Sequence, residues 1–236
     1  MKPTFKPRTK KEKFGAEIYN LLVENFPQTF FVGGTVRDRL LFKKAEDIDI
    51  ATSATPDKII KKFQGKRISF DDSGKSFGNI IAKKDGLTAE ITTFRTDQYT
   101  GSRYPKVSFV KTPKQDSHRR DFTINSLYLS FKTGKILDFH RGLADLRQKR
   151  IRFIGKPEKR IREDPLRIIR ALRFSLDLKF QLDPKTKTAI KKCFFLTNTL
   201  TKSRLTKELS KIKSDDGKRI LLQISNNPKL LDKYFK

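Results

Sequence analysis

The sequence predicts an α+β fold, in which a mixed α/β domain is followed by an all-helical segment after about residue 150. Three observations support this prediction. Short β-rich runs alternate with helical stretches in the first half of the chain. Asp85-Gly86 joins two apolar runs in the pattern of a tight hairpin. From Pro157 onward the pattern becomes helical and strongly basic.

The elements of the first domain are separated by turn residues. Residues 1–13 are basic and lack periodicity, so we expect a flexible arm before a helix at 14–25. A strand at 29–32 ends at Gly33-Gly34, and a further helix follows it. The remaining expected elements are strands at 45–51, 79–84, 87–94 and 135–139, a loop at 97–115, and helices at 56–63, near 125, from 165, at 185–195 and at 205–213.

The charge of the chain points to a polyanionic partner. Lys and Arg total 54 against 26 Asp and Glu, which gives a net charge of +28. A folded chain this basic repels itself, and RNA would relieve the repulsion. The alternative is a compositional bias that serves only solubility. No run of 18 or more apolar residues occurs, so we expect no membrane partner.

Cysteine and histidine are too scarce for several kinds of site. The chain has one cysteine, Cys193, and two histidines, His118 and His140. It therefore forms no internal disulfide and no Cys/His zinc cluster, and we expect a reducing, cytoplasmic setting. Because Cys193 stands in an apolar stretch, we expect a buried structural thiol there.

Two paired carboxylates are the first candidate catalytic residues in the sequence. Asp47 and Asp49 stand two apart on the expected strand at 45–51, so both side chains should share one face while Ile48 and Ile50 enter the core. Neighbouring carboxylates repel each other, and divalent cations relieve that repulsion. A two-metal centre is a usual arrangement for nucleotidyl transfer. Glu90 is a candidate third acid. Read alone, the D-x-D pattern also fits a solvated strand edge.

A glycine pair before the carboxylates suggests a phosphate site. Gly33-Gly34 follows a strand and precedes a helix, where backbone N–H groups can approach a triphosphate closely. Arg37 could add a charged hydrogen bond to the phosphates. An ordinary tight turn is the alternative, and the combination with the two aspartates favours the phosphate site.

Four segments together resemble one enzyme family. FVGGTVRDRLLFKKAEDIDIATSATPDKI resembles the first motif of class II tRNA CCA-adding enzymes and bacterial poly(A) polymerases, in the polymerase-beta-like nucleotidyltransferase superfamily. AEITTFRTD resembles the third-carboxylate strand, SHRRDFTINSLYL the RRDFTINA motif, and IREDPLRIIRALRF the EDxxRxxRaxRF motif. The order and spacing also match, over residues 28–175. Ser126 replaces the usual Ala of the RRDFTINA motif.

The resemblance implies a set of site residues. Asp47 and Asp49 would bind Mg²⁺, with Glu90 as the third catalytic acid. Asp164 and Arg167 would read the base edge with Glu163 in support, and Arg170 would contact phosphate or shape the pocket. The structural alternative is an Asp164 N-cap and a Glu163–Arg167 helical ion pair. The other nucleotide-binding residues implied are Gly33, Gly34, Arg37, Arg119, Arg120, Asp121 and Asn125.

The resemblance also implies domains and an activity. Residues 14–150 would form a polymerase-beta-like catalytic head with a mixed, mainly antiparallel sheet, and 151–236 a helical neck. Family members commonly continue into body and tail helices, so a partner chain or oligomer could supply that part. The implied activity is addition of CCA to tRNA 3′ ends from CTP and ATP, with pyrophosphate release. Poly(A) or A-only addition and a non-catalytic RNA-binding role are the alternatives.

Overall fold

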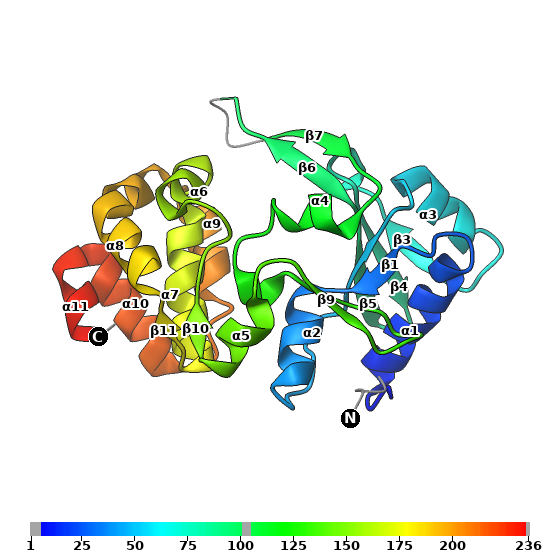
Figure 1. Ribbon diagram of the computed structural model, residues 1–236, viewed down its shortest axis with the longest axis horizontal. Coiled ribbons are helices and arrows are strands. Elements are labelled where there is room, and N and C mark those ends of the chain that lie inside the picture. Colours follow the sequence, from blue (N-terminus) through cyan, green and yellow to red (C-terminus); the bar gives the residue numbers. More distant parts are fainter. Residues whose placement is uncertain (1–5, 101–104, 235–236) are drawn as a thin grey trace. The chain divides into compact units, whose positions relative to one another are not determined.

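The structure is a computed structural model that describes residues 6–100 and 105–234. The chain divides into two compact units (Figure 1). The first comprises residues 1–120 and 125–142, and the second comprises 121–124 and 143–236. The boundary therefore follows Gly142 and not residue 150. Residues 121–124, which the sequence placed in the head, belong to the second unit because Phe122 stacks on Phe153 there, with ring centroids 4.9 Å apart.

A seven-stranded sheet forms the centre of the first unit. Its order is β3-β4-β5-β2-β1-β8-β9, and the β2–β5 pair alone is parallel. This confirms the predicted mixed, mainly antiparallel sheet. The strands are β1 (Thr29–Phe31), β2 (Asp49–Thr52), β3 (Ser69–Asp71), β4 (Asn79–Lys84), β5 (Leu87–Thr93), β8 (Leu127–Leu129) and β9 (Ile136–Asp138).

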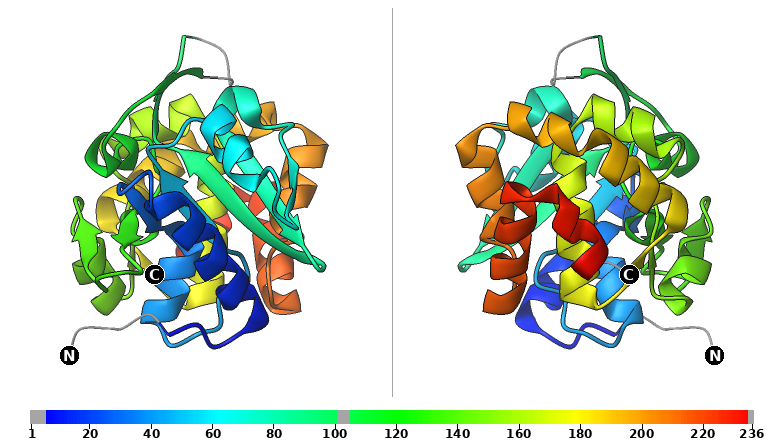
Figure 2. Two further views of the ribbon diagram at one scale, coloured as in Figure 1. Left: turned by 90° about the vertical axis from the view of Figure 1, so that its right-hand side faces the viewer. Right: turned by 90° about the vertical axis from the view of Figure 1, so that its left-hand side faces the viewer.

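The central strands are apolar because both faces of the sheet are covered. Phe31 stacks on Tyr19 of α1 (Lys10–Val23), with ring centroids 5.5 Å apart. Phe30 and Val32 point the other way and join the buried cluster around Phe94. A strand buried on both faces has a continuous apolar run, as the short segment at 29–32 does. Helices α1 and α3 (Pro56–Phe63) pack together on one face (Figures 1 and 2).

The predicted β4–β5 hairpin is present. Asp85 and Gly86 have φ angles of +50° and +74°, and Lys84 pairs with Leu87 across the turn. Two positive φ angles in a two-residue loop match the twist of the flanking strands, which is why Asp-Gly is favoured there. The hairpin brings Glu90 of β5 beside β2 at the middle of the sheet.

Several sequence-based boundaries were wrong. Helix α1 begins at Lys10, where the Thr9 side chain accepts from the Glu12 amide, so residues 10–13 are helical and not an arm. Residues 1–5 of that arm lie outside the described part. The expected loop at 97–115 includes β7 (Lys106–Phe109) and overlaps the end of β6 (Arg95–Gln98) and the start of α4 (Pro113–Ser117). Residues 101–104 of that loop lie outside the described part. The expected helix near 125 is a single 3₁₀ turn, η2 (Thr123–Asn125).

The second unit is mainly helical. Buried Ile168 and Leu172 lie on α7, against which α9 and α10 pack. No helix in the described part of the chain is long and apolar enough to cross a membrane. Helix α5 begins at the boundary between the units, and the first unit also contains η1 (Lys75–Phe77). The elements of the second unit are α5 (Gly142–Arg147), β10 (Arg150–Ile151), α6 (Pro157–Glu163), α7 (Leu166–Leu178), β11 (Gln181–Leu182), α8 (Pro184–Cys193), η3 (Phe194–Thr199), α9 (Lys202–Leu209), α10 (Asp215–Asn226), η4 (Pro228–Leu230) and α11 (Leu231–Tyr234).

Candidate active site

The glycine pair lies directly against a catalytic candidate. Strand β1 leads into α2 (Gly33–Leu40), and Gly33 has a φ of +66°. A Cβ on Gly33 would lie 2.8 Å from Asp49 Oδ2, closer than Cβ contacts allow. Both the backbone angle and the close approach therefore require glycine here. Gly34 is also close to this carboxylate, since a Cβ on Gly34 would lie 3.8 Å from Asp49 Oδ2, and its backbone amide lowers the pKa of Asp49. The glycine turn therefore lies against a negative charge.

Asp49 and Glu90 are neighbours on parallel strands. They are paired in register between β2 and β5, which puts both side chains on the same face of the sheet. The Glu90 Oε1 accepts a hydrogen bond of 3.0 Å from Asn79 Nδ2. Ile48 and Ile50 are buried as predicted, and Asp49 is half-buried between them. The sheet thus places two of the three predicted acids side by side.

Asp47 lies in a bend before the strand and not in the strand itself. The prediction of a strand through Asp47 was wrong, because β2 begins at Asp49. The Thr35 hydroxyl donates to the Asp47 carbonyl over 3.0 Å and accepts from the Asp49 amide over 2.7 Å. These two hydrogen bonds of Thr35, which lies on α2, hold the chain in the bend. The charge of Asp47 still contributes to the raised pKa of Asp49.

The electrostatics of Asp49 fit a cation. Burial raises the pKa of Asp49 to about 7, with further contributions from the charges of Glu90 and Asp47, while Arg120 and the Gly34 amide oppose the rise. A divalent cation would relieve this repulsion. Within 6–100 and 105–234, no three His, Cys, Asp or Glu side chains form a preassembled metal cluster. Mg²⁺ does not need one, since it takes one or two carboxylates and completes its shell with water and substrate phosphates.

Arg37 is buried beside the glycine turn. Its Nε and Nη2 donate to the Asp38 carboxylate over 2.8 and 2.9 Å, and its Nη1 donates to Asn125 Oδ1 over 2.8 Å. Arg37 Nη2 lies 3.6 Å from the position that a Cβ would take on Gly34. Three residues that the sequence predicted to bind nucleotide therefore gather here. Asp38, which the sequence did not point to, holds the guanidinium in place.

The two arginines of the RRD segment share a buried acid. Arg119 Nε donates to Asp116 Oδ1 over 2.7 Å, and Arg120 Nε donates to Asp116 Oδ2 over 3.1 Å. The Tyr128 hydroxyl donates to the same carboxylate over 2.7 Å. Burial raises the pKa of Asp116, but Arg120 and Arg119 outweigh it and hold the value at about 2. Asp116 therefore fixes both guanidinium groups in the first unit.

Asp121 belongs to the second unit, where Arg170 holds it. Arg170 Nε and Nη2 donate to Asp121 Oδ2 over 2.9 and 2.5 Å, and the Phe122 amide donates to Oδ1 over 2.8 Å. Burial raises the pKa of Asp121, but Arg170 and these hydrogen bonds outweigh it and hold the value at about 2. Two predicted nucleotide-binding residues, 49 positions apart, are thus in contact.

The expected base-reading residues lie where α6 meets α7. Glu163 Oε2 accepts from Arg167 Nη1 over 2.8 Å, so Glu163 supports Arg167 as the sequence suggested. Arg167 Nη1 also donates to the Arg160 carbonyl over 2.7 Å. Asp164 accepts from the Leu166 amide over 3.1 Å at the start of α7. Of the two structural alternatives, the Glu163–Arg167 ion pair is present. The expected Asp164 N-cap was wrong, because the N-cap position of α7 is Pro165.

Some side chains that shape these sites carried no signal in the sequence. Thr35 and Asn79 each hold a predicted site residue but belong to no pattern that spacing alone reveals. Asp116 had a weak signal, because an acid three and four residues before Arg119 and Arg120 can reach both on one turn of helix.

Comparison with known proteins identifies the family of this chain. The Poly A polymerase head domain model matches residues 29–152. The CCA-adding enzyme of Bacillus subtilis (strain 168) is 40% identical over 208 residues, covering 87% of this chain and 51% of that protein. The Leuconostoc citreum (strain KM20) CCA-adding enzyme is 49% identical over 166 residues, covering 70% of this chain and 40% of that protein.

A solved structure is similar as well. The crystal structure of the Bacillus stearothermophilus CCA-adding enzyme in complex with CTP has a TM-score of 0.77 at 35% identity, covering 86% of this chain and 49% of that chain. The chain spans about half the length of the curated relatives it matches. The polymerase-beta-like fold expected from the motifs is confirmed by these likenesses. Since the family model covers more than half of the sequence, the chain belongs to the Poly A polymerase head domain family.

Proposed function

We propose that this chain is an RNA nucleotidyltransferase that adds CCA to tRNA 3′ ends from CTP and ATP, releasing pyrophosphate. One observation carries the proposal: Asp49 lies against the Gly33–Gly34 turn, with Glu90 in register beside it. The charge of Asp47, two positions earlier, adds to the raised pKa of Asp49. A phosphate cradle next to grouped carboxylates suits transfer of a nucleotide from a triphosphate. The similar proteins are CCA-adding enzymes, and one was solved in complex with CTP, which supports the same assignment.

The residues of the first unit would bind the metal ion and the triphosphate. Asp47 and Asp49 would hold Mg²⁺, which supplies charge neutralisation at the triphosphate and lowers the pKa of the attacking hydroxyl. Glu90, fixed by Asn79, would act as the third acid beside them. Backbone N–H groups of Gly33 and Gly34 would donate hydrogen bonds to phosphate oxygens. Arg37, Asn125, Arg119 and Arg120 would add donors at the sugar and phosphates.

The residues of the second unit would choose the base. An arginine such as Arg167 offers donors to cytosine O2 and N3, and a carboxylate such as Asp164 accepts from the exocyclic amine of C or A. U and G present a carbonyl where that amine should be, so the pair would reject them. Asp121, held by Arg170, would bind near the ribose, with Glu163 supporting Arg167.

Two other functions follow from particular observations. Poly(A) or A-only addition is compatible with the same carboxylates, and the matching family model is a poly(A) polymerase head. A non-catalytic RNA-binding role is compatible with the net charge of +28. The close carboxylates around Asp49 argue against that role, because their repulsion is costly unless a cation uses it. The same proposal includes a cytoplasmic setting. It also includes further RNA contacts from a second copy of the chain or from another chain.

A nucleotide-resolved extension assay tests the proposal. The protein is incubated with tRNA transcripts that end before CCA, after C, or after CC, with each NTP separately. We expect CTP to extend the first two transcripts and ATP only the third. Extension of unrelated RNA by ATP alone would contradict CCA addition and support A addition. RNA binding without extension of any transcript would favour the non-catalytic role.

A further inference from the structure

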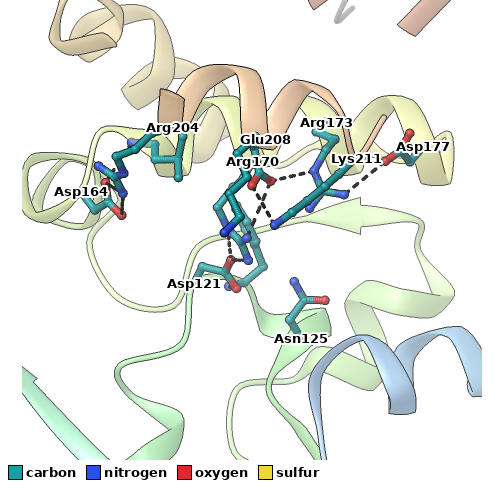
Figure 3. A network of polar contacts seen from close by, with 12 residues as sticks. Asp121, Asn125, Asp164, Arg170, Arg173, Asp177, Arg204, Glu208 and Lys211 are labelled. Carbon is teal, nitrogen blue, oxygen red and sulfur yellow. Dashed lines mark hydrogen bonds and ion pairs between the residues drawn. The ribbon is translucent and has the colours of Figure 1, made fainter. Parts of the chain in front are cut away.

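Helix α9 presents two charged side chains toward the expected base-reading segment. Arg204 and Glu208 stand four apart, so both lie on the same face of the helix. Arg204 Nη2 donates to Asp164 Oδ1 over 3.1 Å and to Asp164 Oδ2 over 3.0 Å (Figure 3). This contact joins residues 40 positions apart within the second unit. The base-edge carboxylate is thus held by a side chain from a separate helix.

The contacts of Asp164 leave a defined acceptor position. A carboxylate offers about four acceptor positions. Oδ1 receives the Leu166 amide and Arg204, and Oδ2 receives Arg204. Among the described contacts, the remaining position is therefore on Oδ2. Because Leu166 and Arg204 donate from two directions, the plane of the carboxylate is fixed and not free to rotate.

We propose that Arg204 is a positioning residue that sets base selection through Asp164. The inference rests on the proposed function, in which Asp164 reads the exocyclic amine of C or A. A fixed carboxylate can only accept a hydrogen bond. It would therefore lie opposite the carbonyl of U or G, and the two acceptor oxygens would repel each other. A carboxylate that can turn away would lose much of that repulsion. Arg204 thus sharpens the rejection of U and G more than it strengthens the binding of C and A.

The anchoring of α9 makes this role separable from folding. Glu208 is buried, and it accepts from Arg173 Nε over 2.7 Å and lies 3.7 Å from Arg170 Nη1 (Figure 3). Arg170 in turn holds Asp121. The buried end of α9 is therefore fixed by Glu208, one turn beyond Arg204. Arg204 itself is only partly buried, with its side chain 30% exposed. Losing its side chain should leave the helix in place.

Measurement of nucleotide selection tests the proposal. The variants are Arg204→Met, which keeps an apolar stem without donors, and Arg204→Lys, which keeps a charge without the planar fork. Arg219→Met is the matched control, because Arg219 forms an exposed pair with Asp216 on α10 of the same unit. For each protein, kcat/KM is measured with CTP and UTP on tRNA ending before CCA, and with ATP and GTP on tRNA ending in CC. Thermal unfolding is followed in parallel.

The expected result is a lower ratio of kcat/KM for CTP over UTP and for ATP over GTP. Arg204→Met should lower the CTP/UTP and ATP/GTP preferences by roughly tenfold, Arg204→Lys should fall between, and Arg219→Met should match the wild type. A variant that merely unfolds loses activity with all four nucleotides and keeps the ratios, so unchanged ratios in Arg204→Met overturn the proposal. A wild-type protein that incorporates the four nucleotides equally, or none of them, contradicts the proposed function itself and this inference with it.

Discussion

Replacing Asp49 by alanine is expected to lower kcat/KM for nucleotide addition by about 10³-fold or more, since a metal ligand stabilises transition-state charge by several kcal/mol. Asp49 is the most constrained of the three acids. It lies against Gly33, is close to Gly34, and pairs in register with Glu90. No other carboxylate in the described chain has these three contacts. Steady-state incorporation of labelled CTP into tRNA ending before CCA measures the loss.

A control on the same sheet separates chemistry from folding. Asp71 lies on β3 and forms a partly exposed pair with Lys83 over 3.2 Å. Asp71→Ala should therefore keep activity close to the wild-type value, since surface pairs contribute little. Both variants should show the circular dichroism of the native protein. If Asp49→Ala retained activity within about threefold of Asp71→Ala, a metal-ligand role for Asp49 would be excluded.

Asp116→Ala is expected to lower the free energy of unfolding by about 3–5 kcal/mol. The Asp116 side chain is fully buried and lies within ion-pairing distance of both Arg119 and Arg120. It also accepts from Tyr128 and from the Arg95 amide over 3.1 Å. Removing it takes the carboxylate from two largely buried guanidinium groups, and breaking a buried pair from one side is costly. Urea unfolding followed by circular dichroism gives the difference.

The matched control for this variant is an exposed ion pair in the same unit. Asp57 Oδ1 lies 2.6 Å from Lys75 Nζ, and both side chains are largely exposed. Asp57→Ala should change the free energy of unfolding by less than about 1 kcal/mol. Equal losses in Asp116→Ala and Asp57→Ala would show that burial of the Asp116 cluster contributes nothing to stability. A selective loss in Asp116→Ala would agree with the structure.

Local spacing was enough to predict much of the first unit's site. Gly33-Gly34 and the two aspartates are close in sequence, and the antiparallel pairing of β1 with β2 brings the turn and Asp49 together. The parallel pairing of β2 and β5 then adds Glu90 in register with Asp49. The hairpin at Asp85-Gly86 was predictable because its two residues favour positive φ. These features depend on backbone conformation, which short sequence patterns encode well.

Contacts over long separations were not predictable in the same way. The Arg204–Asp164 pair spans 40 positions, and the Asp121–Arg170 pair spans 49. A single sequence gives no sign of which arginine among many meets which acid. The start of β2 was also missed, because the Thr35 hydroxyl bends the chain before Asp49 through contacts from another element. Tertiary packing decided these cases over local preference.

Metal binding is the most direct test of the central claim, that the Asp49 carboxylate group and the glycine turn together hold a divalent cation and a triphosphate. Mn²⁺ favours the same oxygen ligands as Mg²⁺ and is visible by electron paramagnetic resonance. We expect the wild-type protein to take up Mn²⁺ more tightly when CTP is present, and the double variant Asp47→Ala/Asp49→Ala to lose that uptake. Equal Mn²⁺ binding by the wild-type and double-variant proteins would contradict the account.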